Sequence, residues 1–205
     1  MGSPPNRDDD RTLRIRLRSV EAATTLFATK GFDATSMKDV ADAAGLSTGV
    51  LSRYFPSREH LALALYDRLA DDLAALAVDL PSGTVARRFE ALMAVRMAQC
   101  EASRRALTAL LGRSLDPESP LYALGPLTES TRAKVQGALG VVIACASDGP
   151  SDAEEISRLA QALYTIHLGV VLATLARPDS AFASALVSQI GKGLAWAGRP
   201  VVRQL

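Results

Sequence analysis

The sequence predicts an all-α protein of about nine helices, and three observations support this fold class. Apolar residues make up 48% of the chain while aromatic residues make up 5%, a composition that favours helices over sheets. Apolar positions recur at spacings of three and four residues, with no convincing strand. Gly, Pro and Ser/Asp clusters divide this pattern into segments of helical length. The predicted helices cover residues 11–30, 36–44, 47–55, 57–78, 84–100, 103–114, 126–147, 152–176 and 180–197.

The ends of the early helices carry clear local signals. Gly31 stands where the C-terminal cap of the first helix belongs. Residues 36–39, Ser-Met-Lys-Asp, have the form of a capping box that starts a short second helix. Gly45 then allows a tight turn, Ser47 caps a third helix, and Pro56 ends it.

Two short helices joined by a turn that contains glycine are the architecture that places a second helix in the major groove of DNA. Residues 36–55 therefore predict a helix-turn-helix motif. The charge distribution agrees, although the net charge is only +1. Residues 11–60 carry eight Lys or Arg against five Asp or Glu, whereas residues 61–205 carry fourteen of each. A surface for a polyanion is therefore expected near the N-terminus.

Catalytic and metal-binding patterns are missing from the sequence. Cys100 and Cys145 lie far apart, and His60 and His167 belong to no Ser/His/Asp set, phosphate loop or metal-ligand spacing. No enzyme activity, metal or cofactor is therefore expected, and two isolated cysteines suit a reducing cytoplasm.

Neither the N-terminal residues nor the longest apolar run predicts a membrane protein. Residues 1–10 are polar and acidic with two prolines, so we expect a disordered tail rather than a signal peptide. The longest apolar run, around residues 168–176, is shorter than the ~18 residues of a membrane span and is interpreted as a buried helix.

The segment from Gly31 to Leu61, GFDATSMKDVADAAGLSTGVLSRYFPSREHL, resembles the DNA-binding domain of the TetR family of repressors. The resemblance begins in the first helix, at AATTLFATKG, and covers roughly residues 11–71. Three positions depart from the family pattern: Ser19 replaces a bulky aliphatic residue, Ser52 replaces a frequent Tyr, and Arg58 replaces Lys.

The resemblance implies both an architecture and a function. Residues 11–71 would form a three-helix DNA-binding domain, and residues 72–205 a helical domain that binds an effector and dimerises. The protein would bind palindromic, double-stranded operator DNA as a homodimer, and a small molecule would release it. Whether it represses or activates, which genes it regulates and which effector it binds are not encoded in these residues.

The expected DNA contacts fall into two groups. The first group contacts the phosphate backbone through hydroxyls, amides and cations, and comprises Arg14, Thr35, Ser36, Tyr54 and Arg58. Arg11, Arg16 and Arg18 extend the basic stretch around Arg14. Base edges are expected to meet the start and outer face of the third helix, at Ser47, Thr48, Gly49, Ser52 and Arg53.

The effector candidates are polar or adaptable side chains within apolar helices, which favours a lipophilic or amphipathic molecule. They are Met93, Met97, Cys100, Tyr122, Gln136, Tyr164 and His167. The last two helices carry wide apolar surfaces with small residues, so we expect them to form a four-helix dimer interface, with an internal core as the alternative.

Two other functions stay open. Arg96, Arg104 and Arg105 lie near Cys100 in sequence, so Cys100 or Cys145 could act as a redox switch in place of a ligand. The modest charge and Ser52 leave a ligand-binding helical dimer without operator binding as the second alternative.

Overall fold

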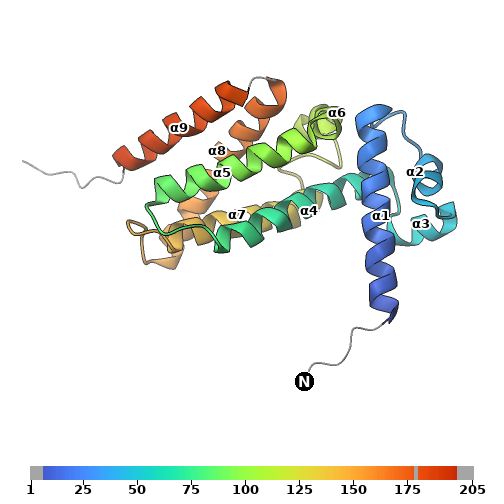
Figure 1. Ribbon diagram of the computed structural model, residues 1–205, viewed down its shortest axis with the longest axis horizontal. Coiled ribbons are helices and arrows are strands. Elements are labelled where there is room, and N and C mark those ends of the chain that lie inside the picture. Colours follow the sequence, from blue (N-terminus) through green and yellow to red (C-terminus); the bar gives the residue numbers. More distant parts are fainter. Residues whose placement is uncertain (1–6, 178–179, 198–205) are drawn as a thin grey trace, which may run out of the picture. The chain divides into compact units, whose positions relative to one another are not determined.

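The computed structural model describes residues 7–177 and 180–197, and every regular element in those ranges is a helix (Figure 1). This confirms the predicted fold class. The elements are α1 (Arg7–Thr29), α2 (Met37–Ala44), α3 (Thr48–Tyr54), α4 (Arg58–Val78), α5 (Val85–Ala102), α6 (Arg104–Leu115), the short 3₁₀ helix η1 (Pro126–Thr128), α7 (Glu129–Ala144), α8 (Ala153–Ala176) and α9 (Ser180–Ala197).

Two predicted boundaries differ from the structure. α1 begins at Arg7, so residues 7–10 of the expected disordered tail are helical, and the rest of that tail lies outside the described residues. Acidic residues such as Asp9 and Asp10 interact favourably with the positive N-terminal end of a helix, which explains the earlier start. The helix predicted over 126–147 opens with η1 and ends at Ala144.

The chain divides into two compact units. The first unit contains residues 1–67 and 103–129, and the second contains residues 68–102 and 130–205. The first boundary between the units lies within α4, between Asp67 and Arg68, close to the predicted boundary after residue 71. α6, however, belongs to the first unit, because it packs along α1 and because Ser114 shares a 2.8 Å hydrogen bond with Tyr66 of α4.

Local caps define the helix-turn-helix of the first unit. The predicted capping box is present: the Ser36 side chain accepts from the Asp39 amide, and the Asp39 carboxylate accepts from the Ser36 amide. Gly45 ends α2 with φ of 64°, in the left-handed region where glycine is favoured. The Ser47 hydroxyl caps α3 by accepting from the Val50 amide at 3.2 Å. These short-range bonds fix the turn between α2 and α3.

Aromatic and small aliphatic side chains fill the core of the first unit. Phe27 and Phe32 contact each other with ring centroids 5.1 Å apart, and Val40, Leu51 and Phe55 are buried. Ser19, which departs from the family pattern, is also fully buried, and its hydroxyl donates to the Ile15 carbonyl at 2.7 Å. The polar substitution is therefore satisfied within α1.

The second unit has a larger apolar core built from α4, α5, α7, α8 and α9. A buried arginine, Arg88 of α5, ties the end of α4 to α7. Its Nε donates to the Val142 carbonyl at 3.1 Å, and its Nη1 donates to the carbonyls of Leu80 and Pro81 at 2.9 and 2.8 Å. Arg88 is thus a hydrogen-bonded structural residue.

α8 is, within the described part of the chain, the one helix long and apolar enough to cross a membrane by length and composition. The longest apolar run in the sequence, around residues 168–176, therefore underestimates the apolar length of this helix. The helix also packs against α5 and α9, and its buried residues include His167 and Thr174. These contacts are those of a core helix in the second unit.

Candidate nucleic-acid interface and effector site

α3 presents a polar, exposed surface at its N-terminal end. Ser47, Thr48, Gly49, Ser52 and Arg53 are all exposed, as a base-reading helix requires. Leu51 and Phe55, on the opposite side, are buried. The predicted division of this helix into a core face and an outer face is therefore what the structure contains.

Gly49 has no internal reason to be glycine. A Cβ added there would meet no atom within 4 Å, and the residue has an ordinary helical backbone. Glycine inside a helix costs about 1 kcal/mol relative to alanine. A small residue at this exposed position is therefore consistent with close approach by something outside the chain.

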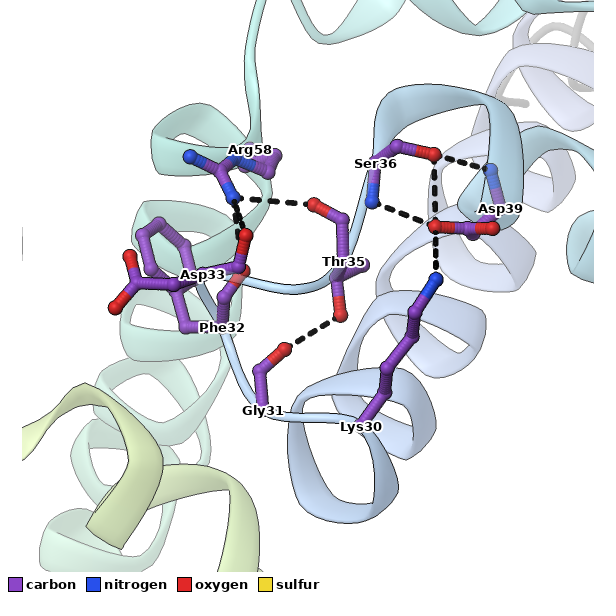
Figure 2. A network of polar contacts seen from close by, with 8 residues as sticks. All are labelled: Lys30, Gly31, Phe32, Asp33, Thr35, Ser36, Asp39 and Arg58. Carbon is purple, nitrogen blue, oxygen red and sulfur yellow. Dashed lines mark hydrogen bonds and ion pairs between the residues drawn. The ribbon is translucent and has the colours of Figure 1, made fainter.

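Thr35 does not offer the phosphate contact that the sequence predicted. Its side chain is buried, and its hydroxyl donates to the Gly31 carbonyl at 2.7 Å (Figure 2). Its amide donates to the Phe32 carbonyl at 3.2 Å. Both polar groups thus hold the loop between α1 and α2, a role set by contacts that sequence spacing does not show.

The hydroxyl of Ser36 is also engaged, because it both caps α2 and donates to the Asp39 carboxylate at 2.7 Å. Asp39 receives a third contact from Lys30, whose Nζ lies 2.7 Å from Oδ2 (Figure 2). The ammonium of Lys30 and the bonds from Ser36 lower the pKa of Asp39 well below its ordinary value. The backbone amides of Met37 and Lys38, in the first turn of α2, are the groups left to meet a phosphate.

Arg58, at the start of α4, holds the same loop. Its Nη1 donates to the carbonyls of Phe32, Asp33 and Thr35 at 3.0, 2.8 and 3.2 Å, and its guanidinium carbon lies 4.9 Å from the centroid of the Phe32 ring (Figure 2). Nη1 of Arg58 is therefore engaged by three carbonyls, and the predicted phosphate contact of Arg58 stays a prediction for the rest of the guanidinium. In this structure Arg58 positions the loop that leads into α2.

The exposed arginines of α1 differ in their contacts within the first unit. Arg18 Nη2 donates to the Ala44 carbonyl at 2.5 Å, and the Arg16 guanidinium lies 4.9 Å from the centroid of the Phe55 ring. Arg14 is exposed and makes a bond within its own helix, to the Asp10 carbonyl. Arg14 thus stays available to a partner, whereas Arg16 and Arg18 brace the helix-turn-helix.

The predicted effector residues do not all gather in one place. Cys100, with Met93 and Met97, lies on α5; Tyr164 and His167 lie on α8, and these two helices pack together. Gln136 is half-buried on α7 of the same unit. Tyr122 belongs to the first unit, where its carbonyl accepts from Thr128, so nothing groups it with the others.

Arg96 is a buried polar residue of α5 that the predicted effector residues did not include. It is 6% exposed, and burial lowers the pKa of its guanidinium. It lies three or four residues from Met93 and Cys100, so its register on the apolar face of α5 was a signal that could have found it. His167 is also buried, and burial, together with the charge of Arg96, lowers the pKa of its imidazole to about 3.

A metal site is not evident in the described ranges, where no group of three or more His, Cys, Asp or Glu could hold an ion. Cys100 is buried and Cys145 is exposed. Burial of Cys100 limits the solvent access that a redox switch requires.

Comparison with known proteins agrees with this arrangement. The family model for bacterial regulatory proteins of the tetR family matches residues 20–65, the span that includes α2, α3 and the start of α4. The match covers the helix-turn-helix, and the second unit lies outside it. The positions at which the helix-turn-helix is capped and turned lie inside the matched span.

Curated relatives are similar to part of the chain. The transcriptional repressor KstR2 of Rhodococcus jostii is 37% identical over 73 residues, which are 36% of this chain and 36% of KstR2. KstR2 of Mycobacterium tuberculosis is 36% identical over 83 residues, 40% of this chain and 41% of that protein. These matches span about two fifths of the relatives' length.

Solved structures of TetR-family proteins share the fold of nearly the whole chain. A regulator from Streptomyces coelicolor aligns with a TM-score of 0.66 at 22% identity, covering 90% of this chain and 81% of its own. The repressor AlkX from a Dietzia strain aligns with a TM-score of 0.59 at 24% identity, covering 90% and 97%. At these identities the likeness concerns the fold.

Proposed function

We propose that this protein is a cytoplasmic transcriptional repressor of the TetR family, which binds a palindromic operator as a homodimer and is released by a small lipophilic effector. The observation that carries the proposal is the exposed, capped start of α3, with Thr48 and Gly49 on its open face, within the segment that matches the family. The similarity of part of the chain to the KstR2 repressors supports repression over activation.

The DNA contacts in this proposal differ from those predicted from sequence alone. Ser47, Thr48, Gly49, Ser52 and Arg53 read base edges. The first backbone amides of α2 bind phosphates, together with the side chains of Arg14 and Tyr54. Arg14 is exposed and Tyr54 is half-buried. Arg58 contributes by positioning the loop before α2.

Dimerisation is assigned to the outer faces of α8 and α9. Leu163, Val170 and Leu175 of α8 are buried in the second unit's own core, so the interface is assigned to the outward positions of the helix. The outward positions of α8 are small or apolar, and they include Leu159, Ala162, Gly169 and Leu172.

Two glycines support this assignment to a second copy of the chain. A Cβ at Gly169 of α8 or Gly193 of α9 would meet nothing within 4 Å, so neither glycine is required by internal packing. Small residues on exposed helix faces allow two helices to approach closely, and a C₂ dimer would use the same faces twice.

Effector binding would end repression because it is thermodynamically linked to operator binding. An effector that binds better to a conformation with a different placement of the two recognition helices lowers the affinity for operator DNA. α4 begins in the first unit and continues into the second, so this proposal assigns it as a continuous helical route for that coupling.

The test is a selection of bound sequences from a random duplex pool by the purified full-length protein. An inverted repeat with half-sites about one turn, roughly 34–36 Å, apart is the expected result. The absence of any enriched sequence at low salt would contradict operator binding and favour a helical ligand-binding dimer.

A further inference from the structure

The second unit contains two buried arginines on one helix, and they differ in how their charge is satisfied. Arg88 donates to four backbone carbonyls, those of Val142, Leu80, Pro81 and Ala77. Arg96, two turns further along α5 and equally buried, leaves its Nε without a hydrogen-bond partner. A buried cation without full pairing is costly to a fold, so a purely structural role does not explain Arg96.

His167 of α8 lies in the same electrostatic neighbourhood and is also unsatisfied. It is 5% exposed, and neither Nδ1 nor Nε2 has a hydrogen-bond partner. Arg96 lies on α5 and His167 on α8, and these two helices pack against each other; the charge of Arg96 also contributes to the lowered pKa of the imidazole. The imidazole ring lies 5.7 Å, centroid to centroid, from that of Tyr164. α5 and α8 therefore bring two orphaned polar side chains together.

The surroundings combine an apolar core with positive charge. Leu92, Met93 and Leu163 belong to the buried core cluster that α5 and α8 share. Tyr164 is acted on by the cations of both Arg96 and Arg132. The carboxylate that acts on Arg96 is Asp72, an exposed residue whose effect is weaker than that of burial.

We infer that Arg96 and His167 form the polar end of an effector site for an apolar molecule that carries a carboxylate. The carboxylate accepts hydrogen bonds from the Arg96 guanidinium and from one N–H of the neutral imidazole, while the apolar part lies among the core side chains. Binding supplies the missing partners of two buried groups, which makes the ligand-bound conformation of α5 and α8 the more stable one.

This inference rests on the proposed function, because it names the chemistry of the effector. The probes are saturated straight-chain carboxylates of six to sixteen carbons, each paired with the primary alcohol of the same length. Their dissociation constants are measured on the full-length protein by calorimetry, together with the shift in Tm. At least one carboxylate should bind about ten- to a hundredfold more tightly than its alcohol, since a hydrogen bond to a charged group outweighs a neutral one.

Arg96→Gln should abolish that preference, so that the carboxylate and the alcohol bind alike. Arg87→Gln is the matched control, because Arg87 is an exposed arginine of the same helix, with 83% of its side chain accessible. A probe labelled with ¹³C at its carboxyl group gives a second measurement on the wild-type protein, the ionisation state of the bound carboxyl. The bound carboxyl should stay ionised at pH values below the pKa that it has in free solution.

The inference fails if no carboxylate outperforms its alcohol, if Arg96→Gln retains the preference, or if the bound carboxyl is protonated. A site that holds only water would give the first of these results. Titration of the selected operator, with and without probe, is run in parallel. Operator binding without carboxylate preference would reject this inference and leave the proposed repressor intact, whereas carboxylate binding without operator binding would reject the repressor.

Discussion

Gly49 shows how a single residue connects packing to recognition. Its position on α3 is exposed and surrounded by empty space, so nothing within the protein benefits from the missing side chain. The sequence correctly placed it on the outer face of the helix. Its cost to helix stability is consistent with a partner that approaches the backbone there.

Replacing Gly49 with alanine should therefore separate stability from DNA binding. Gly49→Ala is expected to raise the free energy of unfolding by up to about 1 kcal/mol and to weaken operator affinity. Urea unfolding and fluorescence anisotropy with the selected operator measure the two effects. A loss of stability, or unchanged affinity, would contradict the role given to Gly49.

Arg58 and Thr35 show what residue patterns could not predict. Both were expected to contact phosphates, but Thr35 is buried and Arg58 bonds three carbonyls located 23 to 26 residues earlier in the chain. Spacing rules describe neighbours within a helix, whereas these bonds depend on how the loop after α1 meets the start of α4.

Arg58→Ala should destabilise the protein by about 1–3 kcal/mol, because three carbonyls lose a charged donor. Arg53→Ala is the control: Arg53 is exposed on α3, so its loss should leave the free energy of unfolding within about 0.5 kcal/mol while still weakening DNA binding. Equal stability of the Arg58→Ala and wild-type proteins would restore the direct phosphate role.

At the scale of elements, local signals predicted the helices well. The capping box at Ser36, the left-handed Gly45 and the cap at Ser47 all occur where the sequence indicated, because each depends on residues three or four positions apart. The placement of α6 was not predictable in this way. Its Arg113 pairs with Asp33 across 80 residues, a contact that no periodicity reveals.

The division of α8 into an inner and an outer face leads to a prediction about assembly. Leu172, 39% exposed on the outer face, should lie in the dimer interface. Leu172→Glu is expected to convert the dimer to a monomer in analytical ultracentrifugation while leaving the helical circular dichroism unchanged, because a buried unpaired charge is costly. Leu124→Glu, an exposed leucine of the first unit, should stay dimeric.

A dimer that survives Leu172→Glu with its affinity unchanged would place the interface elsewhere. Loss of helicity would instead show that this face of α8 supports the fold of the second unit itself.

At the scale of the whole molecule, the first unit has the features expected for DNA and the second has an apolar core with buried polar groups. The excess of basic residues in positions 11–60 is evident from the sequence, which also indicated His167 as an effector candidate. It did not predict that His167 would lack hydrogen-bond partners or lie near Arg96, since that pairing depends on how α5 and α8 pack.

His167 should make stability depend on pH. Burial and Arg96 lower its folded-state pKa from 6.5 to about 3, so between these values the unfolded chain binds more protons than the folded one. The free energy of unfolding should therefore fall as the pH drops from about 6.5 toward 3, by at most about 1.4 kcal/mol per pH unit from this group. His167→Gln should reduce this slope. Identical slopes in wild-type and His167→Gln proteins would show that His167 finds a partner.

The most direct test of the central claim is the base preference of wild-type and Thr48→Ala proteins, measured by titration against the selected operator and a set of its single-base-pair variants. If α3 reads the major groove, Thr48→Ala should change the preference at one symmetric pair of positions, by about 1–3 kcal/mol, and leave the other positions unaltered. A uniform loss of affinity at every position, or no change at all, would contradict the assignment of α3 as the recognition helix.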